Sequence, residues 1–377
     1  MRPLRAAVFL LAPALAAPLW AQTIATIAGN GQPEAGPDGV PAATSPLKLN
    51  DSVPGTVLAD RDGNLHFPES AAHRVRRIER KTGTIATVAG SGEAGFSGDG
   101  GPATAARLRE PSDLAFDPDG NLVIADAGNN RVRRVDRTNG VIETILGTGR
   151  PAFNKDGLAG KETSVGRPTG IAFDARGNLY VADSFAGRIL RLDAKTGLVR
   201  TVAGNNSYSF DANATSATAT GLPVPSQVRL TSTGDIVVSV TGRHALMKVN
   251  PDTGAMTRLA GTGLPGYTGD GGPARDARVS QPAALALDRG DNVWFADWDN
   301  NAVRRVDAKS GVIETRVGSS RVDRFHQKQT AGFSGDGGPA AKALLWHPSA
   351  LGFDKDGSLY ILDARNGRLR KVEKAAR

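Results

Sequence analysis

Five carboxylates recur at one position of a repeated segment and could together hold a cation. The segments are GNLHFPE, GNLVIAD, GNLYVAD, GDIVVSV, DNVWFAD and GSLYILD, and their last residues are Glu69, Asp126, Asp183, Val240, Asp297 and Asp363. Four of the acids are followed five residues later by an arginine, namely Arg74, Arg131, Arg188 and Arg368. The two positions face each other across a hairpin, so we predict that each arginine neutralises its carboxylate. Where the acid is replaced by Val240, the partner position is Ala245, as expected for a pair that is lost together.

One unit keeps the acid but lacks the arginine. Asp297 has Ala302 at the partner position, which predicts an unpaired carboxylate. A tryptophan and an aspartate follow it, and the next connection is longer than the others by nine residues near 321–329 and ends in Trp-His. Departures from a regular pattern often mark function; the alternative is a neutral insertion with packed tryptophans. The predicted ligand-binding residues are Asp297, Trp298, Asp299, His326, Trp346 and His347, and no catalytic residue or metal ligand is assigned.

The segments that carry these residues repeat along the chain. Successive acidic positions are 57, 57, 57, 57 and 66 residues apart, which is typical of a repeat architecture. Within 111–146, alternating apolar residues lie between Asp-Gly and Asn-Gly turns, which predicts four antiparallel strands. Four such strands form one propeller blade. We therefore predict an all-β, six-bladed β-propeller.

The two ends of the repeat region predict how the ring closes. The sixth unit reaches 371–374 without a fourth strand, whereas TIATIAG at 23–29 nearly duplicates TIATVAG at 84–90. The N-terminal strand is therefore expected to complete the last blade and remove an open edge. Residues 22–377 would then form one domain.

Further segments connect successive units. They are AGFSGDGGPATAA (94–106), PGYTGDGGPARDA (265–277) and AGFSGDGGPAAKA (331–343). Together with GNLYVAD, RVRRVD and TVAG, they resemble NHL repeats of the teneurin-like bacterial type over residues 23–377. The resemblance implies a six-bladed propeller, but NHL-like propellers include RNA binders, protein binders, extracellular sensor modules and a few lyases. Related amidating lyases hold zinc with histidines from several blades.

The histidines of this chain do not match that zinc set. His66 lies within a strand, where packing is expected. His73 and His244 occupy equivalent turns of blades one and four, on opposite sides of the ring. Their backbones would be about 20 Å apart, whereas each ring nitrogen must lie about 2 Å from a shared zinc.

Two glycine-containing motifs resemble parts of metal or phosphate sites. The Asp-x-Asp-Gly turns at 60–63, 117–120 and 354–357 lack the remaining ligands of a calcium loop. The GDGG loops at 98–101, 269–272 and 335–338 lack the Lys-Ser/Thr of a P-loop. We expect both to be structural turns, with a metal at Asp99, Asp270 or Asp336 as the alternative. The GDGG loops are expected on the same face as the second-to-third turns, which we call the top face.

The charge of the chain does not indicate a nucleic-acid partner. The formal net charge is +8, but a basic residue recurs in every blade eight positions after the acid, so the charge is spread around the ring. Stacking aromatics, which single-strand binding needs, do not accompany these residues.

The N-terminus predicts export. Arg2 and Arg5 precede the apolar stretch 6–19, and Leu19-Trp20-Ala21 offers a cleavage site before Gln22. Residues 1–21 are therefore expected to be a signal peptide, too short and too interrupted by proline to span a bilayer. The chain has no cysteine, so disulfides and thiol catalysis are excluded. We expect a monomer in the periplasm or the medium, without membrane insertion.

The favoured function is binding or sensing of a protein, peptide or glycan ligand on the top face over blades five and six, without a cofactor. The alternative is a lyase or hydrolase that acts on a peptide or sugar derivative and depends on a divalent metal. Stoichiometric zinc or calcium in the purified protein would favour the enzyme.

Overall fold

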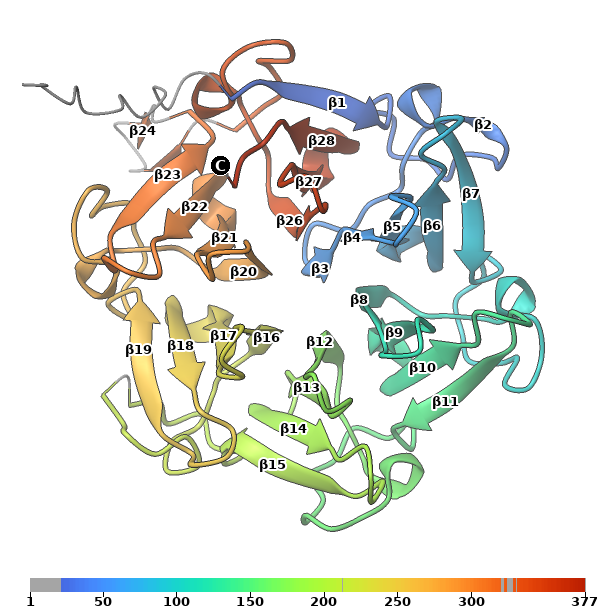
Figure 1. Cartoon of the computed structure of the whole chain (residues 1–377), viewed down its shortest axis with the longest axis vertical. Helices are drawn as coiled ribbons and strands as arrows, with labels where there is room; N and C mark the ends of the chain where they lie inside the picture. The colour runs from blue at the N-terminus through green and yellow to red at the C-terminus, as the bar shows by residue number, and fades with distance from the viewer. Residues whose placement is uncertain (1–21, 212, 320–321, 324–327, 330, 377) are drawn as a thin grey trace, which may run out of the picture.

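The computed structural model describes residues 22–376, apart from 212, 320–321, 324–327 and 330. Six sheets of mainly antiparallel strands are arranged in a ring around a central axis (Figure 1). The predicted all-β, six-bladed propeller is confirmed. The helices within the described residues are single 3-10 turns, and none is long and apolar enough to cross a membrane. The predicted signal peptide, 1–21, lies outside the described residues.

Each blade contributes four strands, which are ordered from the channel outward. Blade one has β4 (Leu58–Ala59), β5 (Leu65–Glu69), β6 (Arg74–Ile78) and β7 (Thr84–Ala89). Blade two has β8 (Pro111–Phe116), β9 (Leu122–Asp126), β10 (Arg131–Val135) and β11 (Ile142–Leu146). Blade three has β12 (Pro168–Phe173), β13 (Leu179–Asp183), β14 (Arg188–Leu192) and β15 (Val199–Gly204).

The second half of the ring follows the same order. Blade four has β16 (Pro225–Leu230), β17 (Ile236–Val240), β18 (Ala245–Val249) and β19 (Met256–Ala260). Blade five has β20 (Pro282–Leu287), β21 (Val293–Asp297), β22 (Ala302–Val306) and β23 (Ile313–Val317). Blade six has β26 (Pro348–Phe353), β27 (Leu359–Asp363), β28 (Arg368–Val372) and the N-terminal β1 (Ile24–Ala28).

The ring closes as predicted. β1 pairs antiparallel with β28, with Ile24 opposite Val372, and the two strands lie side by side in Figure 1. Ile24 and Ala28 are fully buried. Closure therefore combines strand pairing with apolar packing.

Blade one departs from the other blades at the channel. Besides β4, a second short strand, β3 (Gly55–Thr56), precedes β5 and pairs parallel with β26 of blade six. Asp51, Ser52 and Pro54 of the segment that leads into β3 line a cavity described below.

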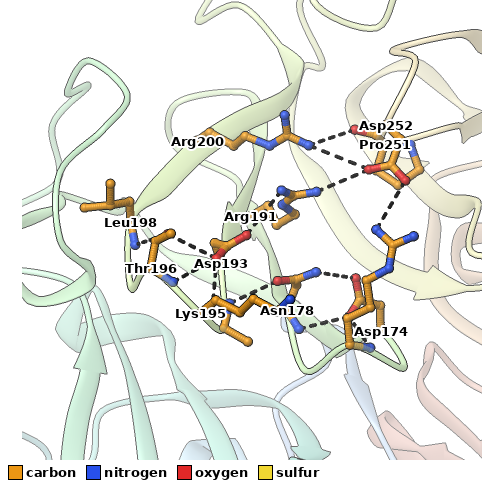
Figure 2. Close-up of polar contacts among 12 residues, drawn as sticks. Asp174, Asn178, Arg191, Asp193, Lys195, Thr196, Leu198, Arg200, Pro251 and Asp252 are labelled. Carbon is orange, nitrogen blue, oxygen red and sulfur yellow. Dashed lines mark hydrogen bonds and ion pairs between the residues drawn. The ribbon is translucent and has the colours of Figure 1, made fainter.

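The aspartates that begin the predicted Asp-x-Asp-Gly turns, Asp60, Asp117 and Asp354, bind groups of their own turns, as does Asp174 at the equivalent position of blade three. In blade three, Asp174 accepts the backbone N–H of Asn178 at 2.9 Å and its side-chain amide at 2.7 Å (Figure 2). Asp60 and Asp117 bind Asn64 and Asn121 in the same way. These turns lie on the face opposite the second-to-third turns, which we call the bottom face.

The GDGG loops do not lie on the top face, contrary to the prediction. Gly100 donates to the carbonyl of Ile142, and Ile142 donates to that of Gly101, so the loop runs along the outermost strand of the next blade. Asp99, Asp270 and Asp336 form ion pairs with Arg133, Arg304 and Arg370, each at 2.7 Å. These loops hold the rim of the ring together, because each one anchors an arginine of the following blade.

Candidate functional site

The regular spacing of acids and arginines forms ion pairs, but the partner is often two residues further on than predicted. Glu69 and Arg74 pair at 2.7 Å, and Asp183 and Arg188 at 3.0 Å, as predicted. Asp126 instead pairs with Arg133 at 3.4 Å, and Asp363 pairs with Arg370 at 3.2 Å. Arg133 and Arg370 lie deeper in the blade and are fixed from the rim by the GDGG aspartates.

The arginines that were predicted for those two blades have another role. Arg131 donates to the carbonyls of Asn129 and Thr148, and its guanidinium lies 3.6 Å from the centre of the Phe96 ring. Arg368 lies 3.8 Å from the Phe333 ring in the same arrangement. A cation above an aromatic ring is stabilised by the ring quadrupole.

Asp297 is not the free carboxylate that the sequence predicted. It is fully buried, and its Oδ2 lies 3.3 Å from Nη1 of Arg304. Its Oδ1 accepts the backbone N–H of Ser280 at 2.7 Å. Burial raises the pKa of Asp297 to about 6, against the opposing effect of Arg304. Asp297 therefore holds the blade together and is closed to a ligand.

Blade four indicates the role of the acid, because the acid, its arginine and the backbone N–H donor are all replaced there. In the other five blades, the acid accepts a backbone N–H from the segment that precedes the inner strand; the donors are Lys48, Arg109, Gly166, Ser280 and Trp346. Blade four has Pro223 at this position, Val240 for the acid and Met247 for the arginine. Proline has no N–H to satisfy. The acid is therefore a structural acceptor, and an apolar trio replaces it where no donor exists.

A cavity of about 230 Å³ opens at the top of the central channel. Its walls come from blades three to six and from the segment that leads into β3. The lining residues are Asp51, Ser52, Pro54, Arg167, Thr169, Ser184, Val224, Ser226, Thr241, Gln281, Ala283, Trp298 and Ser349. The other sizeable cavities in the described structure lie at the bottom face, between neighbouring blades.

A crown of residues surrounds this cavity in an unusual backbone conformation. The residue before the inner-strand proline has a positive φ in five blades, with values from 47° to 53°: Glu110, Arg167, Val224, Gln281 and His347. In four of the five, a side chain of the preceding blade accepts the N–H of this residue; for example, Asn130 accepts the N–H of Arg167 at 2.8 Å. The position that would serve Val224 is Gly187, which has no side chain. Left-handed backbone is costly for a β-branched residue. Val224 adopts this conformation although 44% of its surface is exposed. Packing of its side chain therefore does not explain why a valine is found there.

The hydroxyls of the cavity also link neighbouring blades. Ser184 donates to the carbonyl of Pro225 at 2.5 Å, and Thr241 donates to that of Pro282 at 2.7 Å. Thr169 contacts both Ser184 and the Pro225 carbonyl. These bonds fix the positions of the hydroxyl oxygens at the channel mouth.

Trp298 lines the cavity beside a cluster of charged residues. It begins the 3-10 turn η8 (Trp298–Asn300), and its indole lies 4.3 Å from the ring of His347, centre to centre. Nδ1 of His347 lies 3.0 Å from Oδ2 of Asp51, which also binds Arg365. Burial would raise the pKa of Asp51, but the hydrogen bonds from His347 and Arg365 lower it below its usual value. His347, which is held by Asp51, therefore packs against the Trp298 indole.

The remaining predicted residues are distributed around this cluster. Asp299 accepts hydrogen bonds from Ser280 and from the Gln281 side chain, both at 3.0 Å, and so orients Gln281 at the cavity. Trp346 is 37% exposed and lies 5.4 Å from the guanidinium of Arg365, outside the cavity. His326 lies outside the described residues. The short strands β24 (Val322–Asp323) and β25 (Lys328–Gln329) form the described part of the insertion, and β25 contacts η8.

The channel below the cavity contains an ion pair that sequence analysis missed. Arg229 of blade four reaches Asp113 of blade two, with nitrogen–oxygen distances of 3.0 and 3.1 Å. Thr56 donates to Asp113 at 2.5 Å, and Asp113 is fully buried. The available signal was the irregularity of the inner strands, since the residues equivalent to Asp113 are Thr56, Gly170, Gln227, Ala284 and Ala350.

The histidines in the second-to-third turns hold backbone groups. Nδ1 of His73 accepts the N–H of Glu110 at 3.3 Å, and Nδ1 of His244 accepts that of Gln281 at 3.0 Å. Within the described ranges, no three histidine, aspartate or glutamate side chains are grouped as metal ligands would be.

Comparison with known proteins finds similarity to NHL-repeat proteins and to solved structures. A family model of the NHL repeat matches residues 108–135. The chain is 30% identical over 257 residues to the Arabidopsis thaliana protein SUPPRESSOR OF QUENCHING 1, chloroplastic, covering 66% of this chain and 24% of that protein. It is 28% identical over 276 residues to human NHL repeat-containing protein 2 (67% and 37%) and 27% identical over 292 residues to mouse teneurin-4 (69% and 10%).

Solved structures share the architecture at lower sequence identity. An auxiliary nutrient binding protein from Bacteroides ovatus superposes with a TM-score of 0.66 at 15% identity, covering 94% of this chain and 76% of that one. The chain spans 24% and 37% of the length of the first two curated relatives. The chain is therefore a six-bladed β-propeller that contains an NHL repeat at residues 108–135 and is similar to NHL repeat-containing proteins.

Proposed function

We propose that this propeller is a binding module whose ligand site is the cavity at the top of the channel, with Trp298 in its wall. The carrying observation is that a defined cavity, a half-buried tryptophan and an exposed, strained Val224 meet at one place. Ligand sites are concave, mostly apolar and lined by a few placed polar groups. Backbone strain persists where something other than stability retains it.

This site corresponds in part to the one expected over blades five and six. Trp298, Asp299 and His347 belong to it or support it, whereas Asp297 is structural. The cavity extends further toward blades three and four than the sequence indicated. The fold neighbour from Bacteroides ovatus is described as nutrient binding, which is consistent with a small ligand.

We also propose that the protein is exported and that residues 1–21 are removed. The support is the sequence pattern alone: two arginines, an apolar stretch and an Ala before Gln22. N-terminal sequencing of the protein from a native culture tests this. A mature chain that retains residues 1–21 would contradict it.

A ligand screen with two tryptophan variants tests the site. Purified protein is screened by thermal shift against sugars, amino acids and short peptides, and each ligand is remeasured on Trp298→Ala and Trp346→Ala. Both tryptophans lie on the top face, but only Trp298 lines the cavity. We expect Trp298→Ala to abolish binding and Trp346→Ala to preserve it.

The proposal fails if every ligand found binds Trp298→Ala as tightly as wild type. The metal-dependent lyase or hydrolase remains the alternative function, but the described histidines bind backbone groups or Asp60 and Asp51. Turnover of a screened ligand that stops on addition of a chelator would favour the enzyme.

A further inference from the structure

We propose that the cavity selects an uncharged ligand rich in hydrogen-bond donors, such as one sugar ring of a neutral saccharide. This inference rests on the proposed function and adds the chemical class of the ligand. It follows from where the hydroxyl protons point, from how the charges are paired, and from the size of the cavity.

Four of the hydroxyls that line the cavity, those of Thr169, Ser184, Ser226 and Thr241, donate their protons within the protein. A hydroxyl has one proton and two lone pairs, and a carbonyl oxygen can only accept. Ser184 and Thr241 therefore donate their hydroxyl protons to the carbonyls of Pro225 and Pro282, respectively. Thr169 and Ser226 have only hydroxyls and carbonyls as hydrogen-bond partners, so their protons are also committed within the protein.

These four residues therefore offer lone pairs to whatever enters the cavity. A ligand with O–H or N–H groups satisfies such oxygens. A carboxylate or phosphate offers only acceptors of its own and would face them without a donor.

The charged side chains at the cavity already form ion pairs within the protein. Arg167 lies 3.1 Å from Glu110, and Asp51 is held by His347 and Arg365. An ionised ligand would lose water without gaining a free counter-charge, and that exchange is unfavourable. An uncharged ligand avoids this cost.

The size and the apolar part of the wall fit one ring. The cavity volume of about 230 Å³ lies below the roughly 300–1,000 Å³ of sites for drug-sized ligands. Trp298, Val224 and Ala283 supply apolar surface beside the hydroxyls. A sugar ring has this combination, with C–H groups on its faces and donors around its edge.

Matched pairs of sugars test the class. Calorimetric titration compares D-glucose, D-galactose and D-mannose with the uronates of the same three rings, with N-acetyl-L-leucinamide as an uncharged ligand that is not a polyol. Probes are used up to about 50 mM, because a ligand of this size is expected to bind with a millimolar Kd. We expect at least one hexose to bind, its uronate to bind at least tenfold more weakly, and Trp298→Ala to abolish the signal.

The outcomes separate this inference from the proposed function. If a uronate or the leucinamide binds in a Trp298-dependent way and no hexose binds, the chemical class is wrong and the binding site stands. If no hexose binds at the highest concentration, the class is again wrong. The site itself fails only if the broad screen yields no ligand that depends on Trp298, with the melting temperature of Trp298→Ala showing that the variant is folded.

Discussion

The outer part of each blade and the mouth of the channel differ in how strictly they repeat. In the outer part, the acid, its arginine and the backbone N–H that the acid accepts recur in five blades, and blade four replaces all three together with Pro223, Val240 and Met247. At the channel mouth, the equivalent crown residues are Glu110, Arg167, Val224, Gln281 and His347. They share a backbone conformation but no side-chain chemistry.

This contrast indicates what each region is selected for. Groups that repeat bind one another within a blade and its rim loop, so they maintain the fold. Three of the residues that vary around a fixed backbone, Arg167, Val224 and Gln281, line a shared cavity, so their variety gives that cavity an asymmetric lining. Disrupting the first region should therefore cost stability, whereas changes in the second should alter binding.

Removing the closing strand should have the largest effect. Deletion of residues 22–31 removes β1 and with it the buried Ile24 and Ala28, and it exposes the edge of β28. We expect a loss of about 5 kcal/mol or more in the free energy of unfolding, together with oligomers that form through the open edge. Urea unfolding and light scattering measure both. An unchanged monomer of wild-type stability would contradict closure by β1.

Breaking one buried ion pair should have the next largest effect. Arg304→Ala leaves the buried Asp297 without its partner, which is expected to cost about 3–5 kcal/mol. Blade four suggests a rescue variant. The three substitutions Ser280→Pro, Asp297→Val and Arg304→Met introduce the residues that blade four has at the equivalent positions. We expect the triple variant to regain most of the loss in urea unfolding. A triple variant less stable than Arg304→Ala would show that the blade-four solution does not transfer.

The two turn histidines should make a smaller, pH-dependent contribution. Burial lowers the pKa of His73 and His244, and each neutral ring accepts a backbone N–H. The folded state therefore prefers the neutral form, so their contribution is complete above pH 6.5 and is lost as the pH falls below it. Asn130 and Asn301 make the same bond without titrating.

The matched variant is His73→Asn with His244→Asn. Melting temperatures at pH 7.5 and pH 5.0 should differ more for the wild type than for this variant. An equal pH dependence in both proteins would show that the two histidines do not contribute to it.

Relieving the strain at Val224 should have the smallest effect and the opposite sign. Asparagine tolerates a left-handed backbone, so Val224→Asn is expected to stabilise the protein by about 1 kcal/mol and to weaken ligand binding. Gln281→Asn, at an equivalent position without a branched side chain, should leave stability within about 0.5 kcal/mol. A destabilised Val224→Asn would mean that Val224 is held by packing.

The sequence predicted the ring and its closure because both depend on apolar patterns and turn residues that repeat. It also singled out Trp298 as a candidate, since the repeat breaks there. It misassigned Asp297 because cross-strand spacing pointed to the residue five positions on, Ala302, whereas the partner is Arg304, seven positions on. It could not reveal the cavity, because Thr169, Ser226 and Gln281 come together only through the curvature of the ring.

The indole resonances of the three tryptophans in the propeller test the central claim most directly. Trp298 lines the cavity, Trp346 lies on the same face outside it, and Trp294 is buried with its Nε1 bonded to Asp288 at 2.9 Å. A ¹H–¹⁵N spectrum is recorded while a hexose is added to saturation. We predict a saturable shift of the Trp298 indole signal, with those of Trp294 and Trp346 unchanged. Saturable binding that shifts Trp346 or Trp294 and leaves Trp298 in place would contradict a ligand site at the mouth of the channel.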